Sequence, residues 1–242
     1  MLLTYKGIVI KTINYSETSV IVKVFTDLSG LQTFMIKGAR TSKSKNKISL
    51  LQQLSIIELV AYNKNTSTGI KLVKELKALY NYQSLPYDIY KSSIAMFINE
   101  LIYKTIKDEE RNEILFSFLF QSLIYLDSSA EKYFNFHLIF MLQYAKISGF
   151  SPSANYDAEH TYFNLNEGVF QSQPPLDAEF ISPTYSKILH KLQNSDFENM
   201  SEISIDSETR RYLIEKLLLF YRLHINGFTE INSLKVLHEI LS

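Results

Sequence analysis

The 242-residue chain contains no cysteine and no tryptophan. Without cysteine it cannot form disulfides, use a thiolate nucleophile or hold zinc through cysteine ligands. The absence also fits a reducing compartment, and we expect a cytoplasmic protein. The apolar stretch at the N-terminus is too short and too interrupted for a membrane span or a signal peptide. Residues 114–126 are strongly apolar, but acids flank them, so we expect a buried helix.

Most signatures of catalysis are missing as well. The sequence contains no GxGxxG, GxxxxGK[ST], GxSxG or HExxH motif, and its five histidines are scattered. His160 has only Asp157 and Glu159 nearby, which is a weak set of metal ligands. Consecutive acids at 108–110 point in different directions on a helix and suit its N-terminus better than an acid/base site. We therefore predict no enzyme activity, no cofactor and no metal site.

Charge is distributed unevenly along a chain whose net charge is zero. Residues 1–80 carry a net charge of +8, and residues 81–242 carry −8. Such an asymmetry indicates a polyanionic partner for the basic part, although mutual attraction between the two parts is the simpler alternative. With 46% hydrophobic residues, the chain can build a packed core.

The first 80 residues have the pattern of short β-strands. Five segments rich in β-branched and aromatic residues, "GIVIKTI", "SVIVKVFT", "LQTFMIKG", "SIIELVAYN" and "GIKLVKELKALY", are separated by turn signals. Gly30 in "DLSG" can adopt the positive φ of a tight hairpin. Five such strands predict a small closed barrel over residues 1–80.

After residue 80 the apolar pattern becomes helical. Apolar residues recur at helical spacing from Ile94 to Ile102. We expect a third helix to be capped by Ser129 and to end at Gly149, and a late long helix to be capped by Asp206 or Ser204. Residues 149–183 hold four of the five prolines and predict a lobe inserted into the helical domain of 81–242, with a hairpin around "TYFNLNEGVF".

The stretch "MIKGARTSKSKNK" concentrates positive charge between two predicted strands. Five cations lie within residues 37–47, namely Lys37, Arg40, Lys43, Lys45 and Lys47, and residues 28–57 contain no acid. Loops that only aid solubility usually mix both signs of charge, so we predict phosphate contacts from an exposed loop. Five contacts with one single strand give a log–log salt slope of about −3.5. Of the five aromatics near the strands, Tyr5, Tyr15, Phe25, Phe34 and Tyr62, the sequence does not say which face solvent.

Several short motifs together resemble the bacterial recombination mediator family RecO. They are the "YSE" turn, the "FT…G" hairpin, "KGAR…S" and the closing "YRLHINGFTEINSLKVLHEIL". The resemblance covers nearly the whole chain. It implies an α+β multidomain fold: an OB-fold barrel, then an all-α domain with an insertion near "GFSP". Many members carry a four-cysteine zinc site in that insertion, whereas this chain has no cysteine there.

The resemblance implies a non-enzymatic function. It implies binding of single- and double-stranded DNA, annealing of complementary strands, and partnership with RecR and with the acidic C-terminal tail of SSB, so that RecA loads on SSB-coated DNA. Lys37, Arg40 and the lysines that follow lie on the implied DNA-binding face. Lys11 and Lys23 are further candidates, and Arg210, Arg211 and Arg222 could extend the path, although ion pairs with Glu208 or Glu215 explain these arginines equally well.

Two other function classes remain open from the sequence. In the first, the protein is an interaction adaptor whose basic loop docks on an acidic partner protein. In the second, it is a nuclease or phosphotransferase. That activity needs a carboxylate cluster around Mg²⁺, and the basic region offers only the widely spaced acids at 17, 27, 58 and 75.

Overall fold

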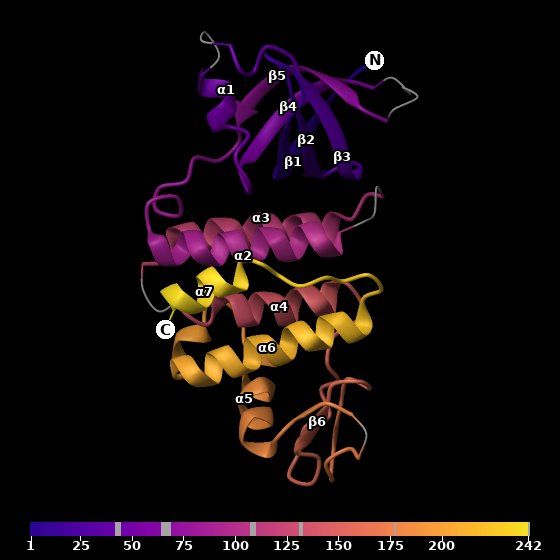
Figure 1. The fold of residues 1–242 in the computed structure, drawn as a ribbon, viewed down its shortest axis with the longest axis vertical. Helices are drawn as coiled ribbons and strands as arrows, with labels where there is room; N and C mark the ends of the chain where they lie inside the picture. Colours follow the sequence, from indigo (N-terminus) through magenta and orange to yellow (C-terminus); the bar gives the residue numbers. More distant parts are fainter. Residues whose placement is uncertain (42–44, 64–68, 107–109, 131–132, 177, 242) are drawn as a thin grey trace. The chain divides into compact units, whose positions relative to one another are not determined.

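A computed structural model describes residues 1–41, 45–63, 69–106, 110–130, 133–176 and 178–241, with the side chains of 45 and 46 excepted (Figure 1). The chain divides into two compact units. The N-terminal unit comprises Met1–Asp88 and Ala95–Asp127, and the C-terminal unit comprises Ile89–Ile94 and Ser128–Ser242. In the described part of the chain, no helix has both the length and the apolar character needed to cross a membrane.

The N-terminal unit is built on a closed five-stranded barrel, which confirms the predicted fold class. Its strands are β1 (Leu2–Asn14), β2 (Val20–Thr26), β3 (Gly30–Ile36), β4 (Ile56–Tyr62) and β5 (Lys71–Ala78). They pair in the order β1-β2-β3-β5-β4. The long strand β1 pairs with two neighbours: its first half pairs with β4, and its second half pairs with β2. Closure leaves no open edge among the described strands of this sheet.

Close packing of β1 on β2 depends on one glycine. A Cβ atom added to Gly7 would lie 2.3 Å from Cγ1 of Val24, closer than two carbon atoms can approach. Inside the barrel, alternate residues of β1 to β4 form one apolar core, and Val73 and Leu76 of β5 pack against it. Tyr5 meets Phe34 edge to face at 5.5 Å. Gly30 has the predicted positive φ, 60°, in the β2–β3 turn.

One helix interrupts the sequence of the barrel, and two more follow its last strand in the chain. The first, α1 (Lys45–Ser49), interrupts the β3–β4 connection, which the sequence predicted as loop, and it lies beside the barrel in Figure 1. Helices α2 (Ile89–Thr105) and α3 (Glu113–Ser128) follow β5. From Ala95 onward α2 belongs to the N-terminal unit, as does α3 up to Asp127. The apolar face predicted on α2 is buried.

A buried carboxylate near the end of α3 anchors the segment that follows the barrel. Asp127 accepts hydrogen bonds from the backbone N–H groups of residues 83–85, at 2.7–3.1 Å, and from the hydroxyl of Tyr80 at 2.9 Å. Burial alone raises the pKa of this carboxyl. The backbone donors and Tyr80 outweigh burial and hold the pKa of Asp127 below its ordinary value of 3.8.

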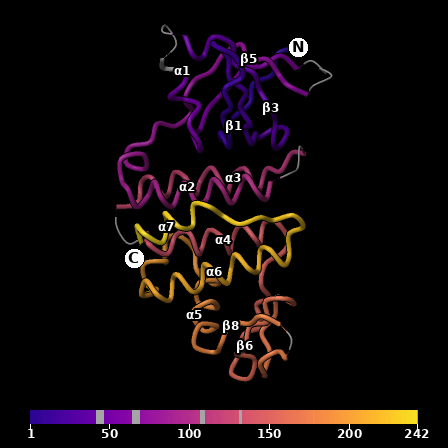
Figure 2. The backbone as a smooth tube through the Cα atoms, viewed as in Figure 1, coloured from indigo at the N-terminus to yellow at the C-terminus, as the bar shows by residue number. Residues whose placement is uncertain are grey.

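The C-terminal unit combines helices with a small sheet. Its helices are α4 (Phe136–Ile147), α5 (Pro183–Gln193), η2 (Met200–Glu202), α6 (Ser207–His224) and α7 (Leu234–Ile240). Figure 2 shows α4 running beside α6. The helix α4 is buried on most of its surface, and the hydroxyl of Tyr221 on α6 donates to the carbonyl of Met141 at 2.6 Å. As predicted, Asp206 caps α6 by accepting from the Thr209 N–H.

The small sheet lies within residues 149–183, for which the sequence predicted an inserted lobe. Its strands are β6 (Tyr162–Asn164), β7 (Val169–Gln171) and β8 (Phe180–Ile181), in the order β7-β6-β8. The β6–β7 hairpin matches the one predicted from "TYFNLNEGVF". The prediction for the third helix was wrong at its start, because α4 begins at Phe136 and Ser129 does not cap it.

We expect Asp127→Asn to lower the free energy of unfolding at pH 7 by about 2 kcal/mol, or roughly 4–8 °C in melting temperature. The native pKa is depressed, so the stabilisation by Asp127 is fully present well above pH 3.8 and is lost as the pH falls through the native pKa. The deficit of the variant should therefore shrink in acid. Thermal unfolding from pH 7 to pH 3 measures it, with Glu110→Gln as an exposed control. A deficit that stays constant with pH would contradict the assigned role.

Candidate nucleic-acid interface

The described cations of residues 37–47 are exposed and are not paired with acids among the described residues. Lys37 and Arg40 lie in the turn that follows β3, and Lys47 lies on α1. Within the described ranges, no carboxylate lies within 4.0 Å of a side-chain nitrogen of these three residues. Lys43 lies outside the described residues, and Lys45 is described only through its backbone. We use the name basic patch for the three described cations of this one connection: Lys37, Arg40 and Lys47.

Arg40 joins two neighbouring connections of the barrel. Its Nη1 donates to the carbonyl of Ser16 at 2.9 Å, and its backbone N–H donates to the carbonyl of Thr18 at 3.1 Å. The strand register agrees, because Val20 at the start of β2 pairs with Ile36 at the end of β3. The β1–β2 turn and the cations after β3 therefore lie side by side. Positive φ at Gly38, 67°, shapes the second of these connections.

The structure separates the five aromatics that the sequence left undecided. Tyr5, Phe25 and Phe34 are fully buried and belong to the core of the unit. Tyr15, in the β1–β2 turn, is 61% exposed, and Tyr62, at the end of β4, is 38% exposed. Only these last two rings can face a ligand in solution.

Lys11 and Lys23 lie on another part of the barrel, as neighbours across β1 and β2. Nζ of Lys11 donates to the hydroxyl of Tyr103 on α2 at 3.1 Å and lies 4.5 Å from the centre of its ring. Nζ of Lys23 lies 5.7 Å from the same ring. The hydrogen bond from Lys11 lowers the pKa of the Tyr103 hydroxyl despite its partial burial. Both lysines are half-buried, and their role in DNA binding stays a prediction.

The arginines predicted on the late helix are in two different settings. Arg210 and Arg211 line a small pocket in the C-terminal unit, whereas Arg222 is exposed near the end of α6. Among the described residues, no guanidinium nitrogen of the three lies within 4.0 Å of a carboxylate oxygen of Glu208 or Glu215, so the ion pairs considered as the alternative are not formed.

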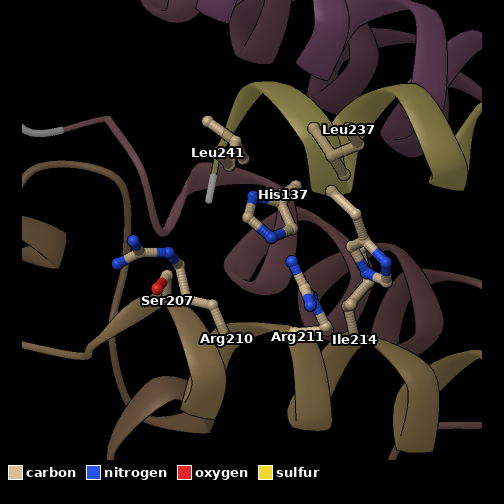
Figure 3. Close-up of a pocket in the computed structure, with 8 residues that line it drawn as sticks. His137, Ser207, Arg210, Arg211, Ile214, Leu237 and Leu241 are labelled. Carbon is tan, nitrogen blue, oxygen red and sulfur yellow. The ribbon is translucent and has the colours of Figure 1, made fainter.

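The pocket lies between α6 and α7, with a side chain of α4 between them (Figure 3). Its lining is His137, Ser207, Arg210, Arg211, Ile214, Leu237, His238 and Leu241. Nη1 of Arg210 donates to the carbonyl of Ile205 at 2.5 Å, and its guanidinium lies 5.8 Å from the ring centre of Phe134. Nε of Arg210 is buried and has no hydrogen-bond partner among the described residues.

Burial decides which charges the pocket carries. It lowers the pKa of His137 to about 3, with Arg210 and His238 acting in the same direction, and it also lowers the pKa of His238. Burial lowers the pKa of Arg210 as well, and Asp206 partly opposes this, but a guanidinium stays charged in proteins. At neutral pH the two arginines therefore carry the positive charge of the pocket, and the two imidazoles are neutral.

Family models match both parts of the chain. The model described as the N-terminal part of recombination protein O covers residues 1–82, and that of its C-terminal part covers residues 86–233. The chain belongs to the RecO family. Relatives named DNA repair protein RecO are 36% identical in Flavobacterium psychrophilum and 34% in Phocaeicola vulgatus, each over 98% of both chains. Another in Christiangramia forsetii is 37% identical over 99% of both. The resemblance seen in the sequence motifs is thus confirmed.

The lobe of this RecO-family chain is held together by aromatic packing. The ring of Tyr156 stacks on His190 at 4.6 Å and meets Phe170 edge to face at 5.3 Å. The side-chain amide of Asn155 completes the link by exchanging two hydrogen bonds with the backbone of Phe170.

Asp157 and His160, two members of the weak metal-ligand set noted in the sequence, contact each other. Asp157 accepts from the backbone N–H of His160 at 2.8 Å and contacts its ring at 2.9 Å, which lowers the pKa of Asp157 to about 2. In the described ranges, no three His, Asp or Glu side chains come together as a metal site.

We expect Tyr156→Ala to destabilise the lobe by about 2 kcal/mol, because it removes a stacked and an edge contact. A chelator such as EDTA should leave the melting curve of the native protein unchanged. Leu176→Ala is the matched control, since Leu176 lies in the same lobe and is 98% exposed. Calorimetry with and without EDTA tests both statements. A chelator-sensitive transition would show that a metal holds the lobe.

Proposed function

We propose that this RecO-family chain is a non-enzymatic, DNA-binding recombination mediator. It binds single- and double-stranded DNA, anneals complementary strands and, with RecR, helps RecA load on SSB-coated DNA in the cytoplasm. The observation that carries the proposal is the basic patch: exposed cations that have no acidic partner among the described residues, on a closed barrel of the family's N-terminal part. Partnership with RecR rests on family membership alone.

Binding through phosphates suits strand annealing. Two complementary strands repel each other, and cations that contact their phosphates release condensed counterions and reduce that repulsion. Phosphate contacts fix position without reading bases, so the pairing edges stay available. The basic patch can make such phosphate contacts, because Lys37 and Lys47 are exposed. Arg40 keeps part of its guanidinium for a ligand after its hydrogen bond to the carbonyl of Ser16.

The two rival functions have less support. An Mg²⁺-dependent enzyme needs clustered carboxylates, but Glu58 and Glu75 form ion pairs with Lys77 and Lys74, at 2.7 and 3.3 Å. An adaptor that docks an acidic protein would use the same basic patch as DNA. A competition experiment compares the adaptor with the DNA-binding protein: oligonucleotides would displace a bound protein partner only if the partner and DNA use the same surface.

The test of DNA binding is fluorescence anisotropy of a labelled single strand at several salt concentrations. We expect Lys37→Ala/Arg40→Ala to reduce the magnitude of the log–log salt slope by about 1.4, because two phosphate contacts are lost. Lys74→Ala/Lys77→Ala removes the same charge from the same unit, but these lysines are paired with acids, so we expect a small change. Equal effects of the two double variants would remove the basic patch from the mechanism.

We further propose that the pocket between α6 and α7 receives the acidic C-terminal tail of SSB. The pocket joins apolar side chains, Leu237 and Leu241, to the charged Arg210 and Arg211. A peptide that ends in an apolar residue and a carboxylate matches this combination. The exposed Arg211 offers guanidinium donors for such an anion.

A labelled peptide with the acidic C-terminal sequence of SSB tests this site. We expect Arg211→Ala to weaken its binding about ten- to hundredfold, since hydrogen bonds to charged groups contribute about 1.5–3 kcal/mol. Arg222→Ala is the control on the same helix and should bind normally. Amidation of the peptide's C-terminus should weaken binding to the native protein. If Arg211→Ala binds the peptide as tightly as the native chain, the tail binds elsewhere.

A further inference from the structure

Tyr15 is the most exposed aromatic ring of the barrel strands and their turns, and it lies next to the basic patch. Its side chain is 61% exposed, whereas the rings of Tyr5, Phe25 and Phe34 are buried. A single exposed aromatic is common on protein surfaces and by itself indicates nothing. What distinguishes Tyr15 is the way its backbone is held.

Hydrogen bonds fix the β1–β2 turn, residues 15–19, on both sides. Within the turn, the N–H groups of Tyr15 and Ser16 both donate to the carbonyl of Ser19, at 3.1 and 3.3 Å, and the Ser19 N–H donates to Oγ of Ser16 at 3.1 Å. From outside, Arg40 donates to the carbonyls of Ser16 and Thr18. The ring is thus presented to solvent on a fixed backbone, which lowers the entropy lost when a ligand covers it.

The charges around the ring favour a nucleic acid. Arg40 reaches the residue that follows Tyr15, and Lys37 follows Ile36, which pairs with Val20 at the start of β2. Glu17 is the one acid of the turn, and it forms no ion pair within 4.0 Å among the described residues. An aromatic ring beside cations is the arrangement by which barrels of this kind stack bases while they contact phosphates.

We propose that Tyr15 stacks on one base of a single strand while Lys37 and Arg40 contact the neighbouring phosphates. The inference deepens the proposed function and rests on it. Stacking uses the face of a base and leaves its pairing edge open, so a complementary strand can still pair with it. In a duplex both faces are already covered by neighbouring base pairs. The contact therefore favours single strands over duplexes and is lost once annealing is complete.

The absence of tryptophan from the chain provides a direct readout. Tyr15→Trp introduces a single indole, and we expect oligo(dT) to quench its fluorescence strongly. Tyr87→Trp is the matched control, because Tyr87 is 84% exposed in the same unit but lies in the segment before α2. An abasic oligonucleotide of equal length has the same phosphates without bases and should leave the Tyr15→Trp signal unquenched. Equal quenching at both positions, or by the abasic strand, would overturn the proposal.

Affinity gives a second, independent measurement. Tyr15→Ala should weaken binding of a single strand roughly five- to hundredfold, with an unchanged salt slope, because a stacked base is lost and no phosphate contact is. Tyr15→Phe should bind like the native chain, and the affinities of Tyr15→Ala for duplex and abasic strands should not change. A loss shared by all three DNAs would mean that the turn itself was damaged, and it would contradict stacking.

The outcomes distinguish failure of the stacking role from failure of the proposed function on which it rests. If the native chain binds no DNA at any salt concentration, the proposed function fails. If the native chain binds with a steep salt slope but Tyr15→Ala binds the single strand equally well, only the stacking role fails. Melting temperatures of the variants, measured alongside, exclude unfolding as a cause of lost binding.

Discussion

Like charges that lie close together repel, and a fold keeps them together only if something offsets the repulsion. In this chain Lys37, Arg40 and Lys47 are exposed in one connection of the barrel, and in the described part no acid pairs with them. Elsewhere on the same unit lysines are neutralised locally, as Lys77 is by Glu58. Under the proposed function, a polyanionic partner offsets the repulsion within the basic patch. The proposed roles in binding and annealing depend on this one imbalance.

The barrel fixes where the cations of the basic patch lie. Hydrogen bonds from Arg40 tie the connection after β3 to the β1–β2 turn, so charge and an exposed ring are brought together by backbone register. The C-terminal unit contributes a site of a different chemistry, a small pocket with two guanidinium groups and apolar walls. The proposed phosphate contacts and the proposed carboxylate site use different residues, so variants of one need not disturb the other.

Local patterns predicted most of the fold. The five strands, the Gly30 turn, the Asp206 cap and the lobe hairpin each depend on residues a few positions apart, and each was recognisable in the sequence. The start of α4 was not, because tertiary packing rather than a cap residue sets it at Phe136. The helix α1 was missed because its five residues carry no apolar periodicity. Long-range contacts could not be predicted at all: Lys11 reaches Tyr103 across 92 residues, and the pocket joins α4, α6 and α7. The basic character of residues 37–47 was readable, but the exposure of Tyr15 required the structure.

Protection of individual lysines is the most direct measure of the central claim. The protein is acetylated under limiting reagent with and without a single-stranded oligonucleotide, and the modification of each lysine is quantified by mass spectrometry. The account predicts that DNA protects Lys37 and Lys47 several-fold, while Lys74 and Lys77 on the same barrel stay equally reactive. If DNA binds and yet Lys37 and Lys47 react as fast as before, the basic patch is not where the strand lies, and the account is wrong.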